Sequence, residues 1–348
     1  MSDSALWEFM KTLNYNDNTL DIFRIIATVQ VFLGHMVTHF AMPGLSVDAV
    51  YFVRGVPILF ALCGFLAAKS LDGKPPIIQY LKQRAIRIIP AFWACIIINT
   101  ILIAVLYETV PTVKQGVIYL FTQFFGLNFY TGDWLRDYGV GTPNGVLWTI
   151  SVQIQFFVLA PLFKKILAKK NLWFGLSAIL GLTFVSILCN RLEPYLPTLV
   201  YKLINVTVLP YAYFLVFGMV VWEHRDAIIP FLTRFKWVLA VAYVAWKFAE
   251  IYLSFPHVLD GVLYNTVTTL LLAGVLFGFS FMRKWRAPID LTYGFYLYHM
   301  IIINIVVELG YTSAGWLLTL LIAATTILCA WLSQVLVEKP CVKLLKKR

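Results

Sequence analysis

The sequence has 348 residues, of which 60% are hydrophobic and 13% are charged, and its mean hydropathy is +0.79. Soluble domains carry about 25% charged residues, so this composition excludes a soluble globular protein and indicates a polytopic protein of the lipid bilayer. The net charge of +11 does not indicate a nucleic-acid partner, because the Lys and Arg residues gather in short loops between apolar segments, which is the pattern that sets membrane topology.

Ten apolar segments have close to the length that a tilted helix needs to cross a membrane. They are residues 24–42, 55–70, 88–107, 146–163, 172–189, 205–222, 237–253, 261–281, 288–309 and 315–336. Clusters of basic residues follow every second segment, and loops of this kind stay in the cytosol. We therefore predict an all-α polytopic membrane helix bundle of about ten transmembrane helices, with both termini cytosolic.

Two stretches between these segments are expected to differ from ordinary loops. Residues 116–130 are apolar, but a further full span there would place the lysines at 164–170 outside, so we expect a re-entrant or outer-surface helix. Residues 131–145 are rich in glycine and predict an irregular outward loop that forms a rim for a substrate. The expected organisation is a cytosolic N-terminal segment at 1–20, a transmembrane domain at 21–340 and a basic cytosolic tail at 341–348.

The first apolar segment carries ionisable residues, which are costly at membrane depth and therefore indicate function. Arg24 and His35 lie eleven positions apart, which at about 100° per residue puts them on one helix face and at about 1.5 Å per residue separates them by roughly 16 Å. If Arg24 lies at the membrane surface, His35 is near the middle of a hydrocarbon core about 30 Å thick. We expect His35 to be functional and His39, one turn further, to be structural.

Basic residues also precede the third segment, in the loop at 80–90. Arg84 and Arg87 share a face of one helical turn, and Lys82 lies beside them. Such a pair of arginines can bind phosphate through planar, bidentate donors, and the alternative is that all three residues only set topology.

Two later segments contain polar and aromatic residues at helical spacing. Trp148, Ser151 and Gln155 share a face in the fourth segment, with Gln153 on another face, and such residues can also simply bind neighbouring helices. Tyr298 and the second membrane histidine, His299, lie among aromatic residues in the ninth segment. Aromatic rings suit a sugar or adenine face, but they equally suit an interfacial belt.

Other polar groups are assigned to structure. Lys247 and Glu250 are one turn apart in the seventh segment and predict an internal ion pair. The five cysteines have no paired spacing and no third ligand accompanies His35 and His39, so neither a disulfide framework nor a metal site is expected.

Taken together, these segments resemble the acyltransferase-3 family, which comprises multi-span enzymes that O-acylate bacterial surface sugars. Arg24-x10-His35 is similar to the family's Arg-x10-His motif, and Arg84-x-x-Arg87-Ile-x-Pro90 is similar to its cytosolic basic motif. Residues 56–66, 147–156, 296–299 and 338–340 resemble further family motifs in the same order. The family usually has glutamate where this chain has Gln153, so no carboxylate role is carried over to that position.

The resemblance implies a multi-pass protein of the bacterial cytoplasmic (inner) membrane that takes acetyl-CoA from the cytosol and acylates a glycan or a lipid-linked sugar. His35 would act as general base or would carry the acetyl group as nucleophile, and Arg24 would assist it. Arg84, Arg87 and Lys82 would bind the acyl-CoA donor, and the residues expected in the acceptor site or pocket are Trp148, Ser151, Gln153, Gln155, Tyr298 and His299. The alternatives are a transporter without acyl transfer, in which Arg24, His35 and Glu250 line a path, and an inactive relative with a scaffold role.

Overall fold

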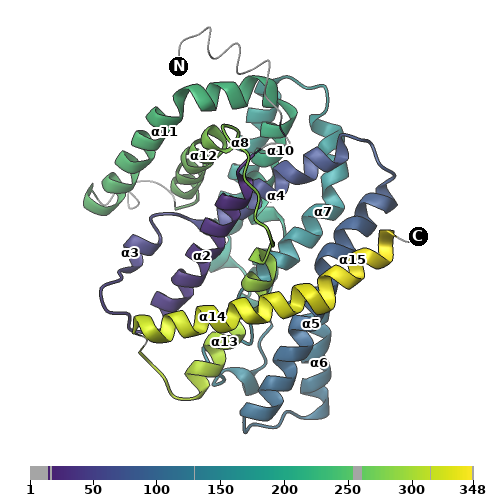
Figure 1. The fold of residues 1–348 in the computed structure, drawn as a ribbon, viewed down its shortest axis with the longest axis vertical. Coiled ribbons are helices and arrows are strands. Elements are labelled where there is room, and N and C mark those ends of the chain that lie inside the picture. The colour runs from purple at the N-terminus through teal and green to yellow at the C-terminus, as the bar shows by residue number, and fades with distance from the viewer. Residues whose placement is uncertain (1–14, 16–17, 129, 254–260, 314, 347–348) are drawn as a thin grey trace. The chain divides into compact units, whose positions relative to one another are not determined.

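A computed structural model of the chain describes Tyr15 and residues 18–128, 130–253, 261–313 and 315–346 (Figure 1). Over these residues the secondary structure is helical, with an isolated β-bridge between Ala41 and Ser313. The predicted all-α polytopic class is therefore confirmed. Most of the N-terminal segment expected at 1–20, and the last two residues of the expected tail, lie outside the described residues.

The chain divides into two compact units, each built from three separate stretches of sequence. Unit 1 comprises Met1–Ala27, Phe52–Pro75 and Phe156–Ile289, and unit 2 comprises Thr28–Tyr51, Pro76–Gln155 and Asp290–Arg348. Two helices, α2 (Leu20–His39) and α7 (Leu147–Leu167), contribute residues to both units.

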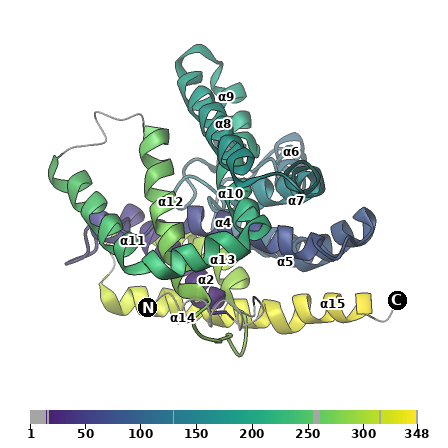
Figure 2. The same ribbon diagram turned by 90° about the horizontal axis from the view of Figure 1, so that it is seen from above.

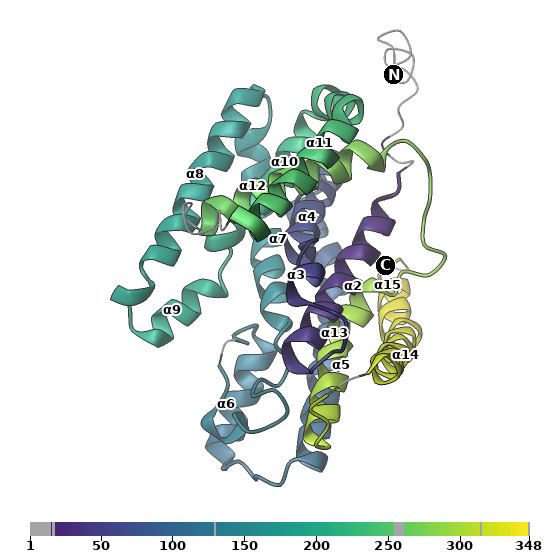
Figure 3. The ribbon, with the colours of Figure 1, turned by 90° about the vertical axis from the view of Figure 1, so that its left-hand side faces the viewer.

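Unit 1 is built from helices that pack in pairs. Its α11 packs along α12 (Figures 2 and 3), and α9 turns back from the end of α8 (Figure 3). Its helices are α4 (Gly55–Leu71), α8 (Leu172–Arg191), α9 (Thr198–Asn205), α10 (Ala212–Glu223), α11 (Arg225–Leu253) and α12 (Gly261–Ser280).

Two glycines allow α4 and α10 of unit 1 to approach closely. A Cβ atom on Gly64 would lie 1.8 Å from the carbonyl oxygen of Leu215, and one on Gly218 would lie 1.9 Å from that of Ala61. Neither position accepts a side chain unless the two helices separate, as is usual where small residues line a membrane helix contact. Gly64 belongs to the stretch 56–66 that resembles a family motif, so its role there is explained by packing.

We expect Gly218→Ala to destabilise the protein by about 1–3 kcal/mol, because the added methyl group overpacks a backbone contact. The measurement is the unfolding midpoint of the purified protein in detergent. Gly181→Ala is the matched control, since Gly181 also lies within a helix of unit 1 but a Cβ atom there meets nothing within 4 Å. Equal midpoints for the two variants would contradict the packing argument.

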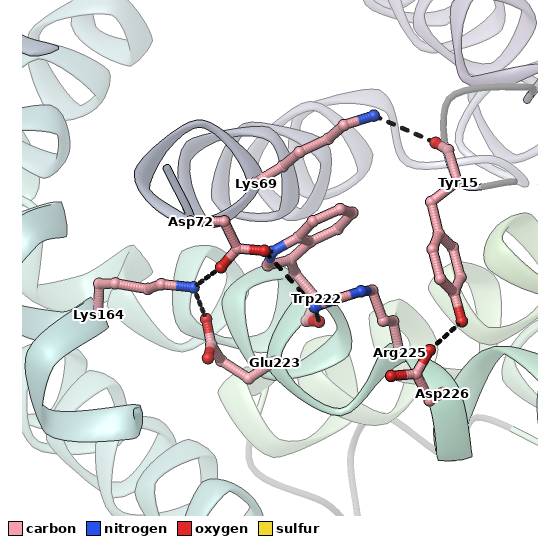
Figure 4. Close-up of polar contacts among 8 residues, drawn as sticks. All are labelled: Tyr15, Lys69, Asp72, Lys164, Trp222, Glu223, Arg225 and Asp226. Carbon is pink, nitrogen blue, oxygen red and sulfur yellow. Dashed lines mark hydrogen bonds and ion pairs between the residues drawn. The ribbon is translucent and has the colours of Figure 1, made fainter. Parts of the chain in front are cut away.

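A polar cluster fastens helix ends of unit 1 to one another (Figure 4). Lys164 of α7 forms ion pairs with Asp72, next to α4, and with Glu223 at the end of α10. The indole N–H of Trp222 donates to Asp72 at 2.8 Å, and the guanidinium of Arg225 lies 4.4 Å from the centre of the Trp222 ring.

The same cluster reaches Tyr15 and the start of α11 (Figure 4). The Tyr15 hydroxyl donates to Asp226 at 2.5 Å, and the Tyr15 carbonyl accepts from Lys69 at 3.1 Å. Burial, together with the hydrogen bond to Asp226, raises the pKa of Tyr15 above its usual range. Three cations, Lys69, Lys164 and Arg225, balance three carboxylates within the cluster. It therefore offers little surplus charge to an anionic substrate, and we assign it to holding the helix ends.

Unit 2 contains the longest helix of the described chain, α5. Its α14 and α15 continue one another through a π-helix at Gln334–Glu338, and together they form one long rod (Figures 1 and 2). The helices of unit 2 are α3 (Val47–Val50), α5 (Ile77–Leu106), α6 (Val113–Phe124), α13 (Thr292–Glu308), α14 (Trp316–Ser333) and α15 (Lys339–Lys346).

A helix overlaps each of the ten predicted spans. Seven described helices are long and apolar enough to cross a membrane, and α9 with α10, bent by 48°, provides an eighth span if the pair crosses once. The other two predicted spans correspond to α12 and α13. Large apolar side chains are exposed along these helices, for example Val105 at 75% and Leu317 at 74%, as expected where lipid is the solvent. The exact number of spans stays a prediction.

The predicted topology has a direct consequence for reporter fusions. With a cytosolic N-terminus, five spans precede Asn190 and eight precede Met282 in our assignment, so the two positions are expected on opposite sides of the membrane. Paired fusions of a reporter active only in the cytosol and one active only outside it measure this. The same side for both positions would show that the span count between them is wrong.

Candidate active site

Three histidines of unit 2 lie together where α2 and α13 meet. The ring centres of His35 and His299 are 5.3 Å apart, with the ring planes tilted by 43°. His39 stacks on His35, with ring centres 5.8 Å apart and planes within 5°. His35 and His39 are half-buried, whereas His299 is fully buried. This histidine cluster brings together two residues that the sequence placed in different segments.

Aromatic rings enclose the deepest member of the cluster. The rings of Phe32, Phe295 and Tyr296 each have their centres within 6.2 Å of the His299 ring centre. The Tyr296 hydroxyl lies 3.0 Å from the hydroxyl of Thr149. Tyr298, also expected in the site, is 3% exposed and lies next to His299 in α13.

The histidine cluster is not arranged as a metal site. No group of three or more His, Cys, Asp or Glu side chains among the described residues could hold a metal ion. The histidine cluster places imidazole nitrogens in an apolar environment. A neutral imidazole there can take a proton from a hydroxyl group or attack a carbonyl carbon.

Arg24 lies on the same helix as His35 but belongs to unit 1. Its guanidinium contacts the carboxylate of Asp21, one turn earlier, at 3.5 Å. Asp21 in turn accepts the backbone N–H of Ala287 at 3.3 Å. Arg24 therefore lies at the start of α2, as expected, within a polar environment.

The basic residues that precede the third predicted span are helical, because α5 begins at Ile77, directly after Pro76. A proline is well suited to precede a helix, and the helix starts eleven residues before the expected span at 88–107. Lys82, Arg84 and Arg87 thus lie within the first turns of α5. Arg84 and Arg87 are three positions apart on one face.

The two arginines have different neighbours in unit 2. The guanidinium of Arg84 lies 5.3 Å from the ring centre of Tyr80. Arg87 is 66% exposed and lies 3.9 Å from the carboxylate of Asp290, which also accepts the Thr292 hydroxyl hydrogen at 2.6 Å. An exposed ion pair of that length is weak. Together with the exposed Lys82, these cations can bind an anionic group at this end of α5.

The π-helix that joins α14 to α15 packs beside this basic turn of α5. Its Gln334 side chain donates to the carbonyl of Asp290 at 2.9 Å, and Glu338 accepts from Ser333 at 3.4 Å. Glu338 begins the stretch 338–340 that resembles a family motif. Single π-helical turns are often found at functional sites.

The polar residues of α7 separate into different roles. The Ser151 hydroxyl donates to Asn128 at 2.8 Å, and the Asn128 amide donates to Gln123 of α6 at 3.0 Å. This supports the simpler interpretation of Ser151 as a contact between neighbouring segments. Trp148, Gln153 and Gln155 are half-buried on the same helix, and their role stays a prediction.

The predicted outward loop is irregular, and a buried amide and a half-buried carboxylate of α13 hold it. Asn304 donates to the carbonyl of Pro143 at 2.9 Å and accepts the backbone N–H of Val140 at 2.9 Å. Glu308 accepts the backbone N–H of Gly139 at 2.8 Å. The site residues predicted from the sequence do not include Asn304 or Glu308. The signal that could have found them is a buried amide and a carboxylate inside an otherwise apolar segment.

Further contacts hold the loop to its neighbours. Asn144 donates to the carbonyl of Leu297 at 2.9 Å, and Asn99 of α5 donates to that of Pro143 at 3.0 Å. Burial, and then the nearby carboxylate of Glu308, raise the pKa of Tyr138 to about 12, so its hydroxyl is neutral at physiological pH. The loop is thus fixed to the same helix that carries His299.

The predicted ion pair between Lys247 and Glu250 is present in unit 1. Glu250 also lies 3.5 Å from Arg54, which contacts Asn265. These contacts explain the presence of a carboxylate at position 250 without a permeation path. Glu250 was the one residue outside α2 that suggested a transporter, so that suggestion now has a structural alternative.

Comparison with known proteins identifies the family. Residues 17–335 match the acyltransferase domain of the acyltransferase-3 family. Nodulation protein 10 of Rhizobium leguminosarum bv. viciae is 26% identical over an alignment of 359 positions, gaps included, that covers 94% of each chain. No solved structure matches the chain. Since the family match takes in most of the sequence, the chain belongs to the acyltransferase-3 family of membrane acyltransferases.

Proposed function

We propose that this membrane acyltransferase is an O-acetyltransferase that moves an acetyl group from cytosolic acetyl-CoA to a hydroxyl group of a cell-surface or lipid-linked glycan. The observation that carries the proposal is the His35 imidazole, placed beside His299 within the apolar part of unit 2. Family membership supports an acyltransferase. The acetyl group, the donor and the glycan acceptor come from the resemblance of the motifs.

The chemistry requires a base close to the attacking hydroxyl. His35 takes the hydroxyl proton, the acceptor oxygen bonds to the thioester carbonyl carbon, the C–S bond breaks and the thiolate leaves and takes up a proton. In the alternative route the His35 nitrogen attacks the thioester first and then passes the acetyl group to the acceptor. Both routes need an uncharged imidazole, and an apolar environment favours that form.

The donor must keep its phosphates in water while its thioester reaches the base. Arg84, Arg87 and Lys82 are suited to the phosphates, because they are basic and lie at one end of α5. Arg24 would help to hold either the thioester end or the phosphates of the donor. The resemblance supports a location in the bacterial cytoplasmic membrane, where a cytosolic donor and an outward acceptor would approach the site from opposite sides.

Mass spectrometry of surface glycans tests the proposal in cells with and without the protein. We expect acetyl-sized additions on one glycan only when the protein is present. The purified protein should also release CoA from acetyl-CoA when the isolated glycan is added. Identical glycans in both cell types, with no release of CoA in the purified system, would contradict the proposal.

A further inference from the structure

The contacts of His299 fix which of its ring nitrogens carries the proton. Nδ1 lies 3.1 Å from the carbonyl oxygen of Phe295. A carbonyl oxygen can only accept a hydrogen bond, so Nδ1 carries the hydrogen and Nε2 keeps its lone pair. The side chain is 0% exposed, and Nε2 has no hydrogen-bond partner among the described residues. A buried acceptor without a partner is costly, so this nitrogen requires a donor.

The rings around His299 indicate which donor that is. Phe32 and Phe295 carry no hydrogen-bond donor, and the Tyr296 hydroxyl, which accepts from Thr149 at 3.0 Å, makes no hydrogen bond to Nε2. His35 has an N–H, and its ring centre lies 5.3 Å from that of His299. Hydrogen bonds between catalytic groups are often long before the substrate binds and shorten in the complex. The proposed hydrogen bond therefore requires that the His35 ring turn an N–H toward Nε2 of His299 in the substrate complex.

We propose that His299 is a positioning residue for His35. Its Nε2 accepts the N–H of the His35 ring, which leaves the lone pair of the other His35 nitrogen directed at the acceptor hydroxyl. This inference rests on the proposed function and adds to it the group that orients the base. When the hydroxyl proton moves to His35, the acceptor oxygen bonds to the thioester carbonyl carbon and the thiolate leaves. His299 stays neutral and stabilises the imidazolium of His35.

Three substitutions of His299 separate the role of Nε2 from that of packing. Leucine removes both nitrogens and suits the apolar surroundings, glutamine can place an oxygen near the position of Nε2, and asparagine can place a polar atom only near that of Nδ1. We expect kcat for acetyl transfer to fall about 10²-fold in His299→Leu and His299→Asn, and to stay within about tenfold of the parent in His299→Gln. The affinity for CoA and the unfolding midpoint should change little.

A double variant tests whether the two histidines act as one unit. Adding His299→Leu to His35→Ala should cause no further loss of kcat, because residues that act together are not additive. Three results would overturn the positioning role: parental kcat in His299→Leu, equal losses in the glutamine and leucine variants, or additive losses in the double variant. Each of these leaves the proposed function intact, since the parent still transfers acetyl groups. A parent protein that transfers none from acetyl-CoA would overturn both.

Discussion

Replacement of His35 by alanine is expected to lower the rate of acetyl transfer by about 10²–10⁴-fold, the usual loss when a general base is removed. If His35 is instead the nucleophile, its loss is expected to abolish turnover. The side chain is half-buried next to His299, so alanine removes the imidazole without exposing a charged partner. Expression, membrane insertion and affinity for CoA should stay close to those of the parent. The measurement is kcat of the purified protein with acetyl-CoA and its acceptor.

His39→Ala is the matched control for this experiment. His39 lies one turn further along α2 and stacks on His35, so its loss changes the same surroundings. If His39 is structural, as the sequence indicates, its variant should keep kcat within about tenfold of the parent. Near-normal turnover in His35→Ala would remove His35 from the mechanism. Equal losses in both variants would show that the site depends on the stacked pair.

The helices of this protein are predictable from the sequence because hydrophobicity over about 20 residues is a local property. A helix overlaps each predicted span, and the shorter α6 (Val113–Phe124) overlaps the apolar segment at 116–130. The start of α5 is the main difference. The stretch 77–87 is too polar to count as membrane-spanning, and Pro90 is a residue that usually interrupts a helix, yet α5 runs from Ile77 through Pro90 into the apolar part.

The arrangement of the site is less predictable, because it depends on contacts between residues far apart in the sequence. The sequence marks His35 and His299 separately as membrane histidines, but the approach of their rings depends on how α2 packs against α13. In the same way, Ser151 is assigned to a contact only when Asn128 is seen beside it. Asn304 was overlooked because a single amide in an apolar helix has many possible partners.

The second large effect is expected at Arg84 and Arg87, the arginines of α5 that are proposed to bind the donor. We expect Arg84→Lys and Arg87→Lys each to weaken the binding of CoA by at least about tenfold, although lysine keeps the positive charge. Charge-assisted hydrogen bonds contribute about 1.5–3 kcal/mol, and 1.4 kcal/mol corresponds to a factor of ten in affinity. Arginine can offer two parallel donors to one phosphate, and lysine cannot. In Arg84→Lys the contact between the guanidinium and the Tyr80 ring is also lost.

Arg283→Lys is the control for a residue that only sets topology, because Arg283 is exposed in the basic stretch after α12 and has no predicted contact with the donor. Its variant should bind CoA as the parent does. Titration of the three purified variants with CoA, at several salt concentrations, separates the two roles. If an arginine binds phosphate directly, its lysine variant should bind CoA more weakly even at low salt. If it contributes only its positive charge, the lysine variant should bind CoA as the parent does, because the charge is kept. Affinities equal to the parent's in all three variants would leave Arg84 and Arg87 with the topological role alone.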